Sequence, residues 1–360
     1  MRNGTGDVLM VGSLPYDTVE EAFRAVATGL GRHAAGFPDG EVGDRTTWVG
    51  FLIGAVFVGH PQLEPDSPMP GELRQPQSDE ERESFRQQGP LTFRVRPGER
   101  IRFDDIHYGT IAVESYRTLQ RLREEGATPP DVRFQVSLPA PNSAIIGFFS
   151  DPDQWPALFQ AYADRLRDEI ALMTEVIPPS DLLVQFDLAW EVVDLSMGER
   201  NYFPFWPDST VDEKWDRHTE RLGELASMVP TEAQLGFHWC YGTWGGWPMT
   251  AMEDLSLCVR LSNEAVAQSD RHVDYVHMPV VKHPGPEFFD PLADLDIGDT
   301  DVYLGIVHHT DGVEGFEERA TLARRFLPSF GVSSVCGYGR IEPAELPHVL
   351  AVHRACAEAM

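Results

Sequence analysis

The sequence predicts a (β/α)₈ barrel formed by a single domain over residues 1–360. Eight short segments rich in apolar residues have the length of buried strands. Most of them are followed by a helical segment after a short connection, which is the order expected for such a barrel. The main competing fold, a doubly wound sheet, is disfavoured because no Gly-x-Gly-x-x-Gly motif follows the first strand. The expected strands lie near residues 8, 34, 132, 182, 234, 273, 302 and 333.

The helices are predicted from apolar residues that recur every three or four positions. The segment 19–30 has this spacing after the first strand, and the segment 153–176 forms a long example after the third. The remaining helices are expected at 110–125, 211–228, 252–267, 315–327 and 343–357.

Residues 46–112 interrupt this alternation between the second and third strands. The segment 61–77 is rich in Pro and Gln, and residues 79–88 are strongly polar. We therefore interpret 46–112 as an insertion that covers the barrel mouth, with a small hairpin expected at 91–106.

Composition excludes several classes of partner. The formal net charge of −28 disfavours nucleic acid and anionic membrane surfaces, which bind Lys and Arg. No stretch approaches the roughly 20 apolar residues of a membrane span. Four cysteines are too few for a disulfide scaffold in a chain of 360 residues, and no signal peptide is evident. We therefore expect reduced thiols and a cytoplasmic location. The oligomeric state is left open.

The most informative motif is His238-Trp-Cys240, at the end of the fifth expected strand. Side chains two residues apart on a strand point the same way, so an imidazole and a thiol would project together. Nitrogen and sulfur ligands suit Zn²⁺, which commonly takes four ligands. Taken alone, however, the motif favours the simpler interpretation, in which Cys240 is a buried apolar residue and His238 a core histidine.

Other polar residues also fall at the carboxyl ends of the expected strands, where barrels of this kind carry their chemistry. Each of them alone is compatible with a structural role, and their convergence on one end of the barrel indicates a site. They are Ser13, Asp39, Glu41, Asp44, Arg45, Gln185, Asp187, His277, His308, His309 and Cys336.

The motifs carry a family resemblance. Val11-Gly-Ser-Leu-Pro15, His238-x-Cys240 and Cys336-Gly337 resemble the catalytic barrel of cobalamin-independent methionine synthase, within the methionine synthase/uroporphyrinogen decarboxylase-like superfamily. The chain is more closely similar to single-barrel relatives of that enzyme. The similarity covers nearly the whole chain except the insertion, and the usual amino-terminal half-chain of the synthase is absent. The motifs that carry this closer similarity are Pro38-Asp-Gly-Glu41, His238-Trp-Cys-Tyr-Gly242, His277-Met-Pro279 and Cys336-Gly-Tyr-Gly-Arg340.

The resemblance implies a zinc cofactor bound by His238, Cys240 and Cys336. The family's fourth ligand is a glutamate on the sixth strand, and His277 is the nearest substitute here.

It also implies binding residues for a thiol substrate. Glu41 and Asp187 match the carboxylates that hold an amino group, and Ser13 and Arg45 lie in matching segments. Asp187 is therefore also expected to serve catalysis, and His308 matches the family's proton-donating histidine.

The leading functional hypothesis is a zinc-dependent alkyl or methyl transferase that takes a small-molecule thiol and an alkyl donor. Methyl transfer from 5-methyltetrahydropteroyltriglutamate to homocysteine is one version, although the net charge opposes a polyglutamate tail. A zinc-dependent thiol-conjugate lyase or epoxide–thiol transferase fits as well. A metal-free decarboxylase of the uroporphyrinogen type would need anion-binding arginines, of which only Arg45 and Arg340 are evident. A barrel that binds a metal or a thiol without turnover is the non-enzyme alternative.

Overall fold

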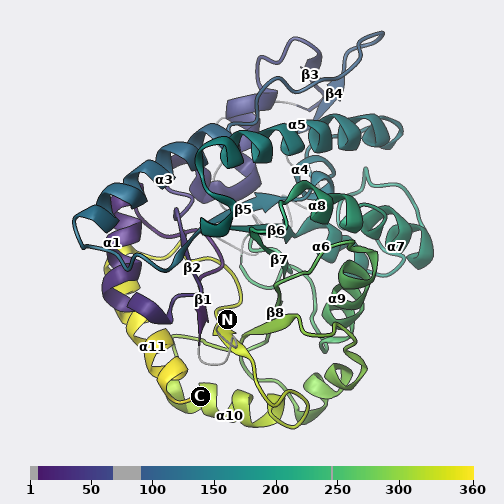
Figure 1. The fold of residues 1–360 in the computed structure, drawn as a ribbon. Helices are drawn as coiled ribbons and strands as arrows, with labels where there is room; N and C mark the ends of the chain where they lie inside the picture. The colour runs from purple at the N-terminus through teal and green to yellow at the C-terminus, as the bar shows by residue number, and fades with distance from the viewer. Residues whose placement is uncertain (1–6, 68–90, 245) are drawn as a thin grey trace.

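Eight parallel strands curl into a ring in this computed structural model, which describes residues 7–67, 91–244 and 246–360. The strand order is β1-β10-β9-β8-β7-β6-β5-β2, and a parallel bridge between Val8 and Ala34 joins its two ends. The predicted (β/α)₈ barrel is thereby confirmed (Figure 1). The strands are β1 (Val8–Leu9), β2 (Gly36–Pro38), β5 (Arg133–Pro139), β6 (Leu182–Leu188), β7 (Gln234–Trp239), β8 (Tyr275–Pro279), β9 (Asp301–Gly305) and β10 (Gly331–Ser333).

Helices surround this ring (Figure 1). The first of them begins at a capping box in which Thr18 and Glu21 satisfy each other's backbone N–H groups. Short helices also follow β5 and β6 at the carboxyl ends of the strands. The helices are α1 (Val19–Gly29), α3 (Tyr108–Glu124), α4 (Pro141–Ile145), α5 (Trp155–Val176), α6 (Trp190–Ser196), α7 (Val211–Thr219), α8 (Leu222–Met228), α9 (Ser256–Gln268), α10 (Gly312–Ala323) and α11 (Leu346–Glu358).

The helix expected at 211–228 is two helices, α7 and α8, because the chain leaves helical geometry at Arg221. The break allows each half to pack on a different neighbour. Lys214 and His218 of α7 reach the buried carboxylate of Asp194 on α6, at 2.6 and 2.8 Å. Helix α8 packs instead on α5 and α9.

The insertion contributes a two-stranded antiparallel ribbon that projects beside α5 (Figure 1). The hairpin expected within 91–106 is wrong in one respect, since β4 (Phe93–Val95) pairs with β3 (Leu63–Pro65) from earlier in the insertion. Packing accounts for this pairing, because the buried ring of Phe93 lies against Phe57 and Phe149. Residues 68–90 of the insertion lie outside the described residues.

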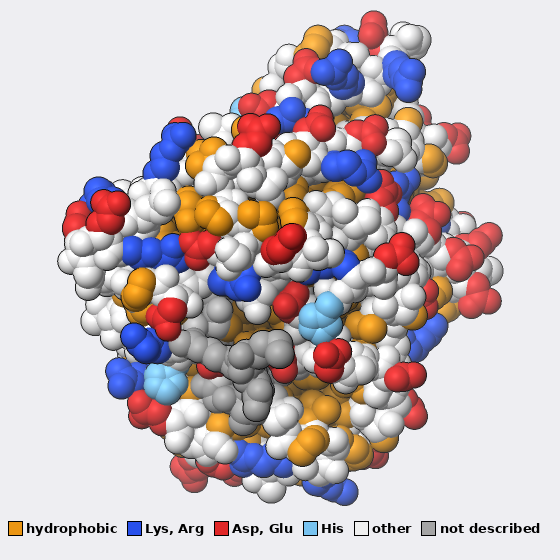
Figure 2. Space-filling view, viewed as in Figure 1, with side chains coloured by type: hydrophobic (Ala, Val, Ile, Leu, Met, Phe, Trp, Pro, Cys, Tyr) orange, Lys and Arg blue, Asp and Glu red, His pale blue; other side chains and the backbone are white. Residues whose placement is uncertain are grey.

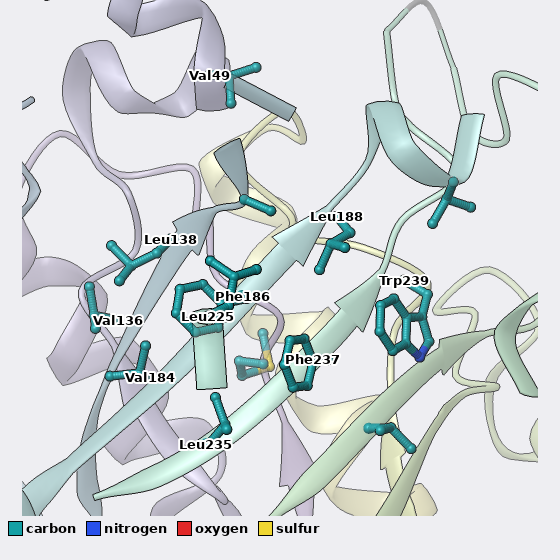
Figure 3. Packing of buried hydrophobic residues seen from close by; sticks show 14 of the residues in the cluster. Val49, Val136, Leu138, Val184, Phe186, Leu188, Leu225, Leu235, Phe237 and Trp239 are labelled. Carbon is teal, nitrogen blue, oxygen red and sulfur yellow. The ribbon is translucent and has the colours of Figure 1, made fainter. Parts of the chain in front are cut away.

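Side chains alternate between the two faces of the ring, as the period of two requires. Figure 3 shows the apolar layer around the strands, where Val184, Phe186 and Leu188 of β6 lie near Phe237 of β7. The intervening residues of β6 face inward, and the Gln185 side chain reaches the Val11 carbonyl across the ring. The same alternation turns His238 inward on β7.

No helix of the described residues is long and apolar enough to cross a membrane. Acidic and basic side chains intermingle over the face seen in Figure 2.

Candidate functional site

Strand register aligns three polar residues of the predicted site. Asp187 of β6 pairs with His238 of β7, and His238 pairs with His277 of β8. Partners in adjacent parallel strands present their side chains on the same face, so all three point into the ring. A register shift of one residue would turn any of them outward to the apolar layer.

The three metal ligands implied by the resemblance lie together. Cys240 follows β7, and Cys336 follows β10 on the other side of the ring. Their Sγ atoms are 3.7 Å apart, and both lie within 4.8 Å of a ring nitrogen of His238. Two sulfurs bound at tetrahedral angles, each about 2.3 Å from a zinc ion, would be roughly 3.8 Å apart. The donor set therefore fits zinc in both chemistry and spacing.

Hydrogen bonds select the tautomer of His238. The His277 Nε2 atom lies 3.0 Å from the Ser334 carbonyl, which can only accept, so Nε2 carries the proton. Burial, followed by the proximity of His238, holds the pKa of His277 well below its ordinary value, so the ring is neutral and its Nδ1 accepts. The His238 Nδ1, 2.6 Å away, must then donate. A neutral His238 consequently presents a lone pair at Nε2.

The Nε2 atom of His238 is buried near the Cys336 thiol and makes no hydrogen bond to a nitrogen or oxygen atom among the described residues. A buried polar atom without a partner is costly, and a metal ion would satisfy it. Metal-binding histidines typically donate their second ring N–H to another group, as His238 does to His277.

His277 itself has both ring nitrogens engaged, and it stands behind His238 rather than facing the thiols. Gly305 of β9 makes room for this arrangement. A Cβ atom there would lie 2.8 Å from the Ser334 carbonyl oxygen, which is the acceptor of the His277 hydrogen bond. Direct metal binding by His277 stays a prediction.

The two thiols titrate as a pair. A hydrogen bond from Cys240 and the neighbouring His238 hold the pKa of Cys336 well below its ordinary value, against the effect of burial. The same hydrogen bond, together with burial, raises the pKa of Cys240. One thiolate is therefore readily formed, while the second proton leaves readily only if a cation takes its place.

The thiols and His238 open onto a cavity of about 690 Å³. Its wall includes Ser13, Glu41 and Asp187 from the predicted substrate-binding set. Ser13 is held close to the Cys336 loop, since its carbonyl accepts from the Tyr338 N–H at 2.7 Å. Most of the remaining wall is apolar, and its larger apolar residues are Trp48, Phe51, Ile53, Phe148, Trp190, Val193, Trp244 and Met249.

Glu41 and Asp187 form an acidic pair at the polar end of the cavity. Burial, reinforced by Asp39 and Cys336, raises the pKa of Glu41 to about 8 although Arg45 opposes the shift. Burial and Glu41 raise the pKa of Asp187. Gln185 orients Asp187 through a 2.8 Å hydrogen bond to Oδ1. Two buried carboxyl groups that resist ionisation together would be stabilised by a bound cation such as an ammonium group.

Besides His277, two residues of the predicted catalytic and substrate-binding set, Arg45 and His308, do not line the cavity. The guanidinium of Arg45 is buried and pairs with Asp39 at 2.9 Å. His308 donates from Nε2 to the Val280 carbonyl at 3.0 Å, and burial and Arg319 lower its pKa to about 4. Their roles in substrate binding and proton transfer stay predictions.

The aromatic residue Trp48 was not among the sequence candidates. It lies in the short helix Gly43–Gly50 at the start of the insertion, with φ 54° and ψ −126°. Such a backbone geometry is unusual for a bulky residue, costs on the order of 1–3 kcal/mol and is typical of functional sites. The one feature of the sequence that could have identified Trp48 is its position just after the charged loop Gly-Glu-Val-Gly-Asp-Arg. Its unusual backbone geometry cannot be predicted from the sequence.

Comparison with solved structures supports the fold. The B12-independent methionine synthase from Shewanella sp. W3-18-1, determined in complex with selenomethionine, matches with a TM-score of 0.61 and 14% identity. The match covers 99% of this chain and 97% of that chain. No protein-family model and no curated protein matches the sequence.

Two further structures match with TM-scores below 0.5. A putative vitamin-B12-independent methionine synthase from Listeria monocytogenes has a TM-score of 0.46 and 13% identity, with 69% of this chain and 68% of that chain covered. A methyltransferase from Methanosarcina mazei has a TM-score of 0.42 and 12% identity, with 68% and 64% covered.

Proposed function

We propose that this protein is a zinc-dependent alkyl transferase, with methyl as the group best supported, and that it acts on a small-molecule thiol. The observation that carries the proposal is the cluster of His238, Cys240 and Cys336 at the wall of a large cavity. The fold shared with a B12-independent methionine synthase agrees with it.

Different residues of the chain would hold the metal, bind the thiol substrate and exclude water. Zinc, when bound, would lower the pKa of an incoming thiol and hold it as a thiolate nucleophile. His277 keeps the His238 lone pair aimed at the cluster through the Nδ1 contact. Glu41 and Asp187 would bind the amino group of an amino-acid thiol, because its positive charge relieves their mutual repulsion. The apolar wall excludes water from the nucleophile.

The alternatives differ in what the cavity must supply. A decarboxylase of the uroporphyrinogen type would need several cationic groups for its substrate's carboxylates. Among the described cavity residues Arg340 is the single Lys or Arg, and it is exposed. A thiol-conjugate lyase, an epoxide–thiol transferase and a non-catalytic binder use the same metal cluster, and only turnover separates them from the leading proposal.

Metal analysis of protein purified without chelator tests the proposal. About one zinc per chain is expected, with loss in Cys240→Ser and Cys336→Ser. Cys356→Ser is the matched control, because Cys356 is buried like Cys240 but lies on α11, outside the cluster. Zinc-free wild-type protein would refute the proposal. Turnover is then measured as the loss of free thiol when homocysteine or another thiol is incubated with the protein and a methyl donor.

A further inference from the structure

We propose that the alkyl donor is an onium compound, a sulfonium or quaternary ammonium ion whose positively charged head enters the aromatic part of the cavity. This inference rests on the proposed function and names the class of its second substrate. The aromatic wall, its charge and the groups available for proton transfer each support it.

The cavity wall is also rich in aromatic rings. Trp48, Phe51, Phe148, Trp190 and Trp244 all line the same cavity. Phe148 and Trp190 are buried, at 6% and 8% exposure, so a ligand there is largely desolvated. Aromatic faces attract cations most strongly where water is excluded, and aromatic pockets recognise quaternary ammonium groups in this way.

The charge of the wall favours the same ligand. Glu41, Asp44 and Asp187 are acidic lining residues, whereas Arg340 is the one Lys or Arg among the lining residues that the structure describes. The Arg340 guanidinium is exposed and donates to the Thr243 hydroxyl. A donor with several carboxylates or phosphates would have few cationic partners here, whereas a cationic donor meets no lining Lys or Arg other than Arg340 among the described residues.

An onium donor also requires no proton-donating residue in the cavity. Its leaving group departs neutral, so the reaction needs no general acid. This agrees with the position of His308, which is hydrogen-bonded to a backbone carbonyl and is not a lining residue. In the step, the thiolate sulfur forms a bond to the methyl carbon as the onium carbon–heteroatom bond breaks. Both electrons of that bond pass to the departing sulfur or nitrogen, and the thiol proton goes to solvent.

The test substitutes Trp48, because this residue lines the cavity and has an unusual backbone geometry. The probe pair is choline and 3,3-dimethyl-1-butanol, its uncharged isostere, measured by calorimetry on metal-free protein. Choline is expected to bind at least tenfold more tightly. Trp48→Leu should abolish most of this preference and Trp48→Phe should keep part of it. Trp215→Leu, which alters a tryptophan of α7 outside the cavity, should leave it unchanged.

Equal or tighter binding of the uncharged isostere would overturn the onium proposal. The two failures are distinguishable, because a zinc-free protein that still prefers choline would overturn the proposed function and the donor role while leaving a pocket for onium ions. With zinc-loaded protein, trimethylsulfonium and homocysteine, dimethyl sulfide and the S-methylated thiol should appear in equal amounts. Absence of dimethyl sulfide, in protein that does turn over a methyl donor that is not an onium ion, would also refute the onium assignment.

Discussion

The Nδ1 atoms of His238 and His277 lie 2.6 Å apart, and this contact connects the candidate metal cluster to the backbone just after β10. His277 accepts from His238 and donates to the Ser334 carbonyl, two residues before Cys336. One hydrogen-bond chain thus links the candidate ligand His238 of β7 to the segment that supplies the candidate ligand Cys336. We expect the geometry of the cluster to depend on this chain.

Removal of the His277 imidazole should weaken zinc binding without abolishing it. In His277→Ala the His238 Nδ1 loses its acceptor and the ring loses its fixed tautomer. Changes of this kind typically cost 10–100-fold in metal affinity. Competition with a chromophoric chelator measures the effect. The control is His353→Ala, which removes an equally buried imidazole on α11. Equal affinities in both variants would contradict the role assigned to His277.

Zinc K-edge absorption should report two sulfurs, one nitrogen and one further light ligand in the resting protein. Both nitrogens of His277 are engaged, so a second imidazole is not expected at the metal. Addition of homocysteine should raise the count to three sulfurs. A spectrum with two sulfurs and two imidazoles would instead make His277 the fourth ligand.

Arg45 should matter more for stability than for thiol affinity. Arg45→Met leaves the buried Asp39 carboxylate without its cation, which typically costs about 3–5 kcal/mol. The double variant Arg45→Met/Asp39→Asn removes both charges and should recover much of this loss. Urea unfolding of the two single variants and the double variant measures the coupling. A large rise in the thiol KM of the double variant, with stability restored, would favour direct substrate binding by Arg45.

Glu191 should make the protein less stable as pH rises. Its carboxylate is buried beside Ser143, and burial raises its pKa to about 7 from an ordinary value of 4.5. The folded state therefore holds a proton that the unfolded chain has released, and this stabilisation is lost as pH rises from about 4.5 through 7. The shift corresponds to roughly 3 kcal/mol at most. Comparison of Glu191→Gln with the wild type, by urea unfolding from pH 5 to 8, isolates this group. If the free energy of unfolding had the same pH dependence in Glu191→Gln and in the wild type, the role assigned to Glu191 would be contradicted.

The strands were predictable because each is a short apolar run, most are followed by a segment with helical spacing, and their inward residues lie at alternate positions. Two local features could not be predicted from such patterns. The break between α7 and α8 follows from the packing of Lys214 and His218 on Asp194, which lies on another helix. The β3–β4 ribbon pairs segments on either side of residues 68–90, and periodicity within one segment contains no information about such a partner.

The sequence by itself determined the fold class and the strands at whose carboxyl ends His238-x-Cys240 and Cys336 lie, because residue type and spacing are local properties. Only the tertiary structure decided which groups meet. In the folded chain the two sulfurs lie 3.7 Å apart, and His277 contacts His238 and Ser334. Arg45 pairs with Asp39 and His308 donates to a backbone carbonyl, so neither lines the cavity. These contacts depend on strand register, on burial and on which hydrogen-bond partners are within reach, and all three are set only when the ring of strands has formed.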